Sequence, residues 1–99
     1  MRPKKIIITG GATRIGAAIA ESLANYDTEI SIHYNKSKGA ALKLKDKLKK
    51  LGSQIHLLKA DLNNFKQTQK LLKSANKKMK GLDCLINNAS LFENDNLQN

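Results

Sequence analysis

The chain has 99 residues, which is enough for one small domain with a single hydrophobic core. Hydrophobic residues make up 40% of it, as in ordinary globular proteins, but the formal net charge is +10. The cations are mostly lysines, and lysine is a hydrated point charge, whereas nucleic-acid sites favour arginine. The charge therefore indicates a solvated lysine surface, with nucleic-acid binding as the less favoured alternative.

Cysteine content and hydropathy exclude further classes of protein. The single cysteine, Cys84, excludes an internal disulfide and a cysteine-based metal cluster. Because Cys84 lies in an apolar run, we expect it to be a small buried side chain. No apolar stretch is long enough to span a membrane or to form the core of a signal peptide, so we expect a cytoplasmic protein.

Short apolar runs alternate with helical periods along the chain. This pattern predicts strands at 5–9, 29–34, 54–59 and 83–87, and helices at 14–25, 38–51 and 64–80. Strands separated by amphipathic helices form right-handed crossovers, which place the strands in one parallel sheet. The sequence therefore predicts an α/β fold: a doubly wound sheet of four strands in the order 3-2-1-4, with helices on both faces, in one domain spanning 1–99.

Each predicted helix carries a stripe of residues at helical spacing that we expect to be buried. These are Ile15, Ala18, Ile19 and Leu23 in the first helix, Ala41, Leu44, Leu48 and Leu51 in the second, and Phe65, Thr68, Leu72, Ala75 and Met79 in the third. The lysines between positions 43 and 50 mostly avoid the stripe, which indicates a solvated side. Asn64 and Gln67 resemble a capping box, and Gly52 and Gly81 are expected to stop the second and third helices.

The most informative segment is TGGATRIG at 9–16, between the first strand and the first helix. Gly10, Gly11 and Gly16 let backbone N–H groups approach a ligand closely, and the helix start supplies a positive field. A nucleotide pyrophosphate needs both. The segment matches neither G-x-G-x-x-G nor a P-loop, and a plain strand-to-helix turn is the alternative. Arg14 stands where a glycine would be expected and adds a charge suited to a third phosphate.

The segment after the second strand favours NADP(H) over NAD(H). NAD-specific sites place an acid about twenty residues past the turn, where it bonds the ribose 2′-hydroxyl. This chain instead reads HYNKS at 33–37. Arg14, Lys36 and Ser37 are expected to converge on a 2′-phosphate, which a carboxylate would repel. Alternatively, His33 is a packed side chain and Lys36 is one surface lysine among many.

Polar residues also follow the third and fourth strands, at the edge where a ligand is expected. Asp61, followed by Leu62, either accepts a hydrogen bond from an adenine amino group or caps a turn. Asn87 and Asn88 either line the place where the backbone bends toward a ligand or form an ordinary turn. Each position therefore has a binding and a structural interpretation.

Together these motifs resemble the short-chain dehydrogenase/reductase superfamily, whose fold is Rossmann-like. Its T-G-x-x-x-G-x-G turn corresponds to 9–16, with Arg14 in place of the middle glycine. Its Asp-Leu pair corresponds to 61–62, and its N-N-A-G motif appears as NNAS at 87–90. The chain resembles the pteridine reductase branch in four features: Arg14 in the turn, Ser90 in the NNAS motif, the HYxKS segment and Phe92. This branch contains NADPH-dependent reductases.

The resemblance implies a role for each matching position. The residues implied in binding NADP(H) are Gly10, Thr13, Arg14, Ile15, Gly16, His33, Tyr34, Asn35, Lys36, Ser37, Asp61, Leu62, Asn88, Ala89 and Ser90. Ser90 and Phe92 are implied as substrate contacts, with Phe92 stacked on a pterin ring. Alternatively, Phe92 packs beneath a loop.

The catalytic pair of the superfamily, Tyr-x-x-x-Lys on a later helix, is missing. Tyr34 and Lys38 have this spacing, but they lie in the expected cofactor-phosphate loop, so we expect no catalytic residue in this chain. A doubly wound sheet typically has six strands, and four are predicted. We therefore expect the N-terminal part of a longer enzyme, inactive alone and self-associating through its bare sheet edge. A non-catalytic nucleotide-binding module is the alternative.

Overall fold

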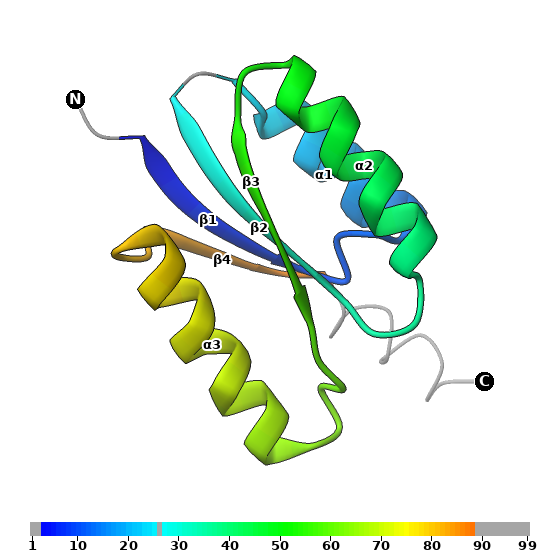
Figure 1. Ribbon diagram of the computed structural model, residues 1–99, viewed down its shortest axis with the longest axis vertical. Coiled ribbons are helices and arrows are strands. Elements are labelled where there is room, and N and C mark those ends of the chain that lie inside the picture. The colour runs from blue at the N-terminus through cyan, green and yellow to red at the C-terminus, as the bar shows by residue number, and fades with distance from the viewer. Residues whose placement is uncertain (1–2, 26, 89–99) are drawn as a thin grey trace.

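A computed structural model describes residues 3–25 and 27–88 (Figure 1). The elements follow in the predicted order: β1 (Lys4–Thr9), α1 (Arg14–Leu23), β2 (Thr28–Tyr34), α2 (Lys38–Lys50), β3 (Gln54–Lys59), α3 (Phe65–Met79) and β4 (Cys84–Asn87). The predicted bounds differ from these by two residues at most. All seven predicted elements are therefore confirmed.

The four strands form one parallel sheet in the order β3-β2-β1-β4, as predicted. Helices α1 and α2 lie on one face of the sheet, and α3 lies on the other (Figure 1). Because the strands are parallel, their carboxyl ends meet at one edge. The segments after β1, β2, β3 and β4 are thereby brought to the same end of the molecule.

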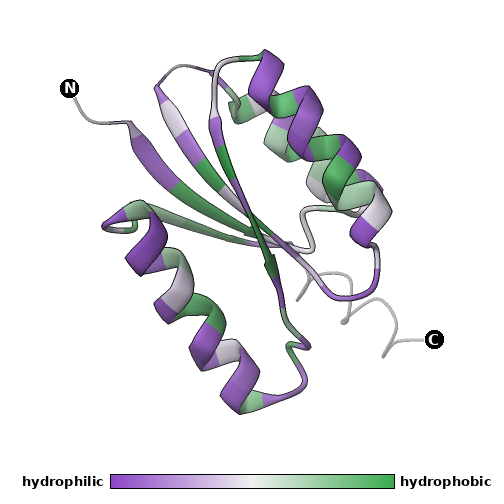
Figure 2. Ribbon diagram, viewed as in Figure 1, coloured by the Kyte–Doolittle hydropathy of each residue, from purple (hydrophilic) through white to green (hydrophobic). Residues whose placement is uncertain are grey.

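Two apolar layers hold the helices against the sheet. On the α1/α2 face, isoleucines of β1 and β2 pack with Leu44 and Leu48 of α2. On the α3 face, Ile7 and Leu58 pack with Leu71, Ala75 and Met79 of α3. Hydrophilic and hydrophobic positions alternate along α2 and α3 (Figure 2), and most of the lysines in both helices are exposed, which is consistent with the predicted solvated lysine surface.

The buried side of α1 differs from the prediction. Ile15 is 62% exposed and Ala18 is also exposed, whereas Gly16 and Ala20 are fully covered. Ile19 and Leu23 are half-buried and pack against the core of this face, as predicted. The small residue Gly16 is buried because a close approach is required where α1 begins beside the turn at 10–13.

In α2, Ala41, Leu44 and Leu48 are buried as predicted, but Leu51 is 44% exposed. Leu51 is the C-cap residue rather than part of the last helical turn, so it leaves the buried stripe. Gly52 follows with a φ of 104°, a conformation that favours glycine, and this confirms it as the stop of the helix.

In α3 the buried row runs through Leu71, Ala75 and Met79, at intervals of four. The predictions for Ala75 and Met79 are confirmed, but Leu72 is 38% exposed and Phe65 is 74% exposed. Thr68 is half-buried. The predicted stripe was displaced by one residue at its centre, because residues 71 and 72 are both leucine and the spacing admits either.

The caps of α3 agree with the prediction in part. The Asn64 side chain accepts a hydrogen bond from the Gln67 N–H (3.1 Å). The Gln67 side chain does not return this bond, and accepts instead from the N–H of Asp61 (2.8 Å). At the other end Lys80 takes the left-handed conformation, with a φ of 58°, and Gly81 follows with a φ of 139°. The helix therefore ends one residue earlier than expected.

Strand β4 lies at the edge of the sheet, and the prediction that Cys84 is buried is wrong. Cys84 is exposed, and its neighbour Leu85 is 48% exposed. β4 pairs with β1 on one side, as predicted, and its other side has no strand within the described residues. Self-association through this edge stays a prediction.

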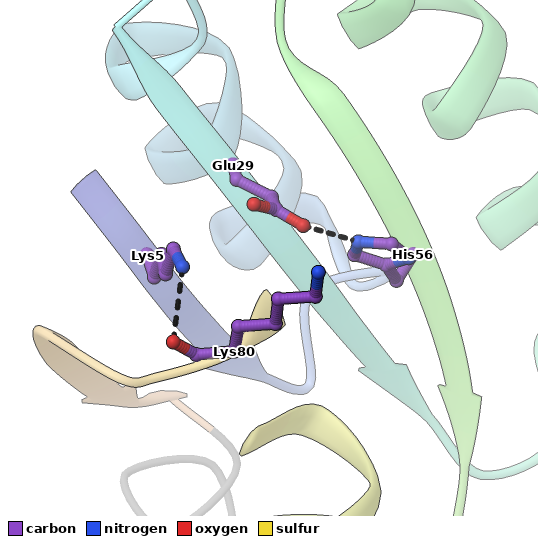
Figure 3. A network of polar contacts seen from close by, with 4 residues as sticks. All are labelled: Lys5, Glu29, His56 and Lys80. Atoms are coloured by element: carbon purple, nitrogen blue, oxygen red, sulfur yellow. Dashed lines mark hydrogen bonds and ion pairs between the residues drawn. The ribbon is translucent and has the colours of Figure 1, made fainter. Parts of the chain in front are cut away.

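A polar cluster lies near the amino ends of the strands, away from the edge where the motifs gather (Figure 3). The Lys5 ammonium donates to the carbonyl of Lys80 (3.1 Å), and His56 pairs with Glu29 (2.6 Å). Lys5 and Glu29 are both buried. The first contact holds the end of α3 against β1, so we interpret this cluster as structural.

Candidate nucleotide-binding site

The turn between β1 and α1 is held from both sides at Gly10. The Gly10 N–H donates to Nδ1 of His33 (2.8 Å), and the next N–H, of Gly11, donates to the His33 carbonyl (3.0 Å). The Gly10 carbonyl accepts from the Thr13 hydroxyl (2.7 Å) and from the Asn88 side-chain amide (3.1 Å). Gly10 has a φ of 65°, which is strained for residues other than glycine. β2 and the end of β4 thus shape the turn.

The other two glycines of the turn are required by packing. A β-carbon on Gly11 would lie 2.8 Å from the Ile32 side chain. A β-carbon on Gly16 would overlap the Gly10 carbonyl oxygen and lie 2.7 Å from the Gly11 α-carbon. The glycines therefore allow the first turn of α1 to pack directly against the strand-to-helix turn, which brings the helix start to the sheet edge.

The start of α1 presents donors suited to an anion. Thr13 is the N-cap residue, and its hydroxyl accepts from the Gly16 N–H (3.2 Å). The N–H groups of Arg14 and Ile15 meet no protein acceptor in the described part of the chain. The first turn contains no acidic residue, and both side chains are exposed. Free donors and the helix dipole together fit a phosphate group.

The start of α2 lies beside this turn, after the neighbouring strand. Ser37 is its N-cap residue but makes no capping hydrogen bond through its hydroxyl, and the first turn of α2 also lacks acids. Lys36 and Ser37 are exposed, as is Asn35, while Tyr34 is half-buried. Two acid-free helix starts, each with an exposed basic residue nearby, therefore flank the same edge.

His33 lies inside the protein rather than on the ligand side. Its side chain is 3% exposed, and both ring nitrogens are used within the fold. Nδ1 accepts from Gly10, so the ring proton lies on Nε2, which donates to the Ala60 carbonyl (2.8 Å). Burial lowers the pKa of His33 below its ordinary value of about 6.5, and the hydrogen bond to Ala60 opposes that shift.

This lowered pKa predicts a loss of stability in acid. As the pH falls below about 6.5, His33 in the unfolded chain gains a proton before His33 in the folded chain does. The free energy of unfolding should therefore be constant above about pH 7.5 and fall between 6.5 and the folded pKa, by at most about 1.4 kcal/mol per pH unit. Urea unfolding at several pH values measures this slope. The control is His33→Asn, which keeps His56, and an equal slope in both proteins would contradict the expectation.

The loops after β3 and β4 are also built from the predicted residues. One oxygen of the Asp61 carboxylate accepts from the Asn63 N–H (3.0 Å), which confirms its turn role, while adenine binding stays a prediction. Leu62 packs against the α3 layer. Asn88 is buried and also donates to the Thr13 hydroxyl (3.0 Å). Ala89, Ser90 and Phe92 lie outside the described residues.

Two internal bonds that shape this edge were not predicted from the sequence, one made by Ala60 and one by Asn88, although Asn88 itself was predicted at this edge. The Ala60 carbonyl binds His33, and the Ala60 N–H donates to the Tyr34 carbonyl (3.1 Å). The amide of Asn88 ties β4 to the turn. The sequence did contain one signal for the role of His33: a histidine near the end of a buried strand, with glycines after the adjacent strand.

Other kinds of site are not found in the described part of the chain. No group of three His, Cys, Asp or Glu side chains is placed to hold a metal ion there. Within the same residues, no helix has the length and hydropathy needed to cross a bilayer. The candidate site is the carboxyl edge of the sheet, where the glycine turn and the two acid-free helix starts lie.

Solved structures show how widely this arrangement occurs. The chain has a TM-score of 0.80 and 34% identity to a short-chain dehydrogenase from Oenococcus oeni, covering 87% of this chain and 40% of that one. An NADH-dependent reductase, A1-R′, complexed with NAD has a TM-score of 0.79 at 29% identity, covering 87% and 36%. A Burkholderia cenocepacia dehydrogenase with bound NADP has a TM-score of 0.80 at 28% identity, covering 87% and 34%.

Curated sequences agree with the structural matches. The chain is 34% identical over 95 residues to a short-chain dehydrogenase/reductase of Pestalotiopsis microspora, covering 96% of this chain and 36% of that protein. It is 36% identical over 88 residues to elsinochrome reductase 1 of Elsinoe fawcettii, covering 89% and 33%. The homolog YusS of Bacillus subtilis is 28% identical over 88 residues, covering 89% and 81%.

The chain thus spans about a third of the length of the first two relatives. Residues 4–99 match the family described as short chain dehydrogenase. The matched range includes the turn, the basic segment after β2 and the asparagines that end β4. With the sheet order, the glycine packing and the acid-free helix starts in agreement, the chain belongs to the short-chain dehydrogenase family.

Proposed function

We propose that this chain is the cofactor-binding part of an NADPH-dependent reductase. The observation that carries the proposal is the pair of acid-free helix starts at one sheet edge, with exposed Arg14 on one and exposed Lys36 and Ser37 on the other. Free N–H groups at α1 suit the pyrophosphate, and the second helix start suits the 2′-phosphate.

The preference for NADPH is argued from charge. A carboxylate after β2 would bond a ribose 2′-hydroxyl and repel a 2′-phosphate, and the segment 33–37 contains none. The hydroxyl of Ser37, not used for capping, and the cations of Arg14 and Lys36 offer charge-assisted hydrogen bonds instead. One structural relative is bound to NAD and another to NADP, so the proposal of NADPH is based on these residues and not on the family.

The chemistry proposed for the whole enzyme follows from the cofactor. A bound nicotinamide cofactor would supply a hydride, and the described residues would bind and orient the cofactor. A tyrosine outside this sequence would donate the proton, because Tyr34 ends β2 next to the segment proposed to bind the cofactor phosphate. The proposal of a pteridine-like substrate depends on the resemblance at the HYxKS segment, Ser90 and Phe92. A carbonyl substrate is equally compatible with the described site.

The direct test is Arg14→Gln, which removes the charge and keeps a good helix former at the start of α1. The variant is expected to bind NADPH about 10- to 100-fold more weakly, because a hydrogen bond to a charged group contributes about 1.5–3 kcal/mol. Binding of NADH should be unchanged. Isothermal titration or cofactor fluorescence on the wild-type chain and the variant measures both constants.

The matched control is Lys43→Ala, which removes an exposed cation from the middle of α2. It should leave both constants within about twofold, since a solvent-exposed charge that makes no direct contact with the ligand contributes little at moderate ionic strength. Equal affinity of the wild type for NADPH and NADH, or an equal loss in both variants, would refute the assignment of Arg14 to the 2′-phosphate.

The second candidate is a nucleotide-binding module without catalysis. The Bacillus subtilis homolog favours it, because the chain covers 81% of that protein, so at least one relative has a similar length. The two proposals share the cofactor site and differ in turnover. Oxidation of NADPH with carbonyl or dihydropteridine substrates distinguishes them when it is measured on the longer gene product, because both proposals expect the 99-residue chain alone to be inactive.

A further inference from the structure

His33 connects three strand ends through one buried ring. It belongs to β2, it accepts from Gly10 after β1, and it donates to Ala60 after β3. Both bonds are 2.8 Å long, and the side chain is 3% exposed. These partners lie 23 and 27 positions away in the sequence, so the contact is purely tertiary.

The two bonds need different chemistry at the two ring nitrogens. The Gly10 N–H can only donate, so Nδ1 must carry no proton, and the Ala60 carbonyl can only accept, so Nε2 must carry one. A hydrogen bond at one nitrogen of an imidazole selects the tautomer presented at the other. The Ala60 carbonyl therefore keeps Nδ1 available as the acceptor for the turn.

The bond to Gly10 acts at the start of the phosphate turn. Other bonds hold the neighbouring groups, with the Gly10 carbonyl bound by Thr13 and Asn88 and the Gly11 N–H bound by the His33 carbonyl, but Nδ1 of His33 is the acceptor for the Gly10 N–H. Without the Nδ1 acceptor, the Gly10 N–H would point into the protein interior with no partner, and the turn would rotate to relieve this. The free N–H groups of Arg14 and Ile15 would move with it.

We propose that His33 is a positioning residue for the nucleotide, which acts through Gly10 and does not touch the ligand. This inference rests on the proposed nucleotide function. It replaces direct cofactor contact by His33 with an indirect role: neutral His33, in the Nε2–H tautomer, holds the backbone that orients the phosphate-binding N–H groups. Its effect on affinity depends on an acceptor at Nδ1 and not on the volume of the ring.

Three variants separate these two dependences. His33→Asn places its side-chain oxygen near the position of Nδ1 and keeps the acceptor, His33→Gln reaches the position of Nε2 and keeps only a donor for Ala60, and His33→Phe fills the volume alone. The constants for NADPH are measured on the full chain, with thermal unfolding measured in parallel. We expect His33→Asn to bind within about threefold of the wild type, and His33→Gln and His33→Phe at least tenfold more weakly.

A role in packing alone predicts the opposite order, because glutamine and phenylalanine fill the ring volume better than asparagine does. That order, or equal affinity in all three variants while the wild type binds NADPH, would overturn the positioning role and leave the nucleotide function intact. A wild-type chain that binds no NADPH would overturn the nucleotide function and this inference together.

A second measurement uses the wild type alone, so it still tests the proposal if the variants do not fold. Long-range proton–nitrogen NMR of the wild-type imidazole identifies the protonated nitrogen directly. A proton on Nε2, with a Gly10 amide protected from exchange, supports the proposal. A proton on Nδ1 overturns it, because Nδ1 could then not accept from Gly10.

Discussion

Gly16→Ala is expected to destabilise the chain by about 3 kcal/mol and to abolish nucleotide binding. The added methyl would overlap the Gly10 carbonyl oxygen and lie 2.7 Å from the Gly11 α-carbon. Both contacts are with backbone, so no side-chain rotation relieves them, and overpacking of this kind typically costs about 1–3 kcal/mol. The start of α1 must move away from the turn, and its free N–H groups leave the sheet edge. Urea unfolding and NADPH titration measure the two losses.

Gly39→Ala provides the matched control for stability. Gly39 lies in the first turn of α2, and a β-carbon there would meet nothing within 4 Å. Alanine is the better helix former by up to about 1 kcal/mol, so this variant should be unchanged or slightly more stable. Equal destabilisation by the two substitutions would show that loss of glycine, rather than contact at Gly16, determines the effect.

Leu71→Ala is expected to lower the free energy of unfolding by about 2–5 kcal/mol, as large-to-small changes in a core do. Leu71 is 4% exposed and packs with Ile7 and Leu58 of the sheet. A loss of this size is a large part of the stability of a small domain, so much of the chain should be unfolded at 37 °C. Denaturant titration followed by circular dichroism gives the value.

Leu72→Ala makes the same chemical change one position along α3. Leu72 is 38% exposed, and its substitution should cost less than about 1 kcal/mol. The pair therefore tests which side of α3 faces the sheet. If Leu72→Ala is the more damaging of the two, the rotation of α3 described above is wrong and the stripe expected from periodicity is right.

Helical periodicity alone does not determine which side of a helix faces the sheet. A wide apolar stripe admits either of two adjacent apolar residues, and 71 and 72 are both leucine. The same holds in α1, where Ile15 and Ala18 match the helical spacing but Gly16 and Ala20 are the buried residues. The deciding factor is the distance between helix and sheet. A small residue occupies the buried position in the first turn of α1 because this turn must approach the Gly10 carbonyl closely.

The sequence by itself determined the order of elements, the parallel sheet and the edge at which the motifs gather. Alternating apolar runs and amphipathic periods admit few topologies, since crossovers are right-handed and consecutive strands lie close together. The glycine turn, Arg14 and the missing acid after β2 were also local features, each contained in a short segment. They were sufficient to predict the family, while the preference for NADP(H) stays a prediction.

The tertiary structure alone decided what the individual side chains contact. Cys84 is exposed although its neighbours in the sequence are apolar, because β4 pairs with a strand on one side only within the described residues. His33 binds Gly10 and Ala60, which are distant in the chain, so its role as an internal support could not be read from its own segment. Side-chain roles depend on what lies across the sheet, and the sheet brings those partners together only when the chain folds.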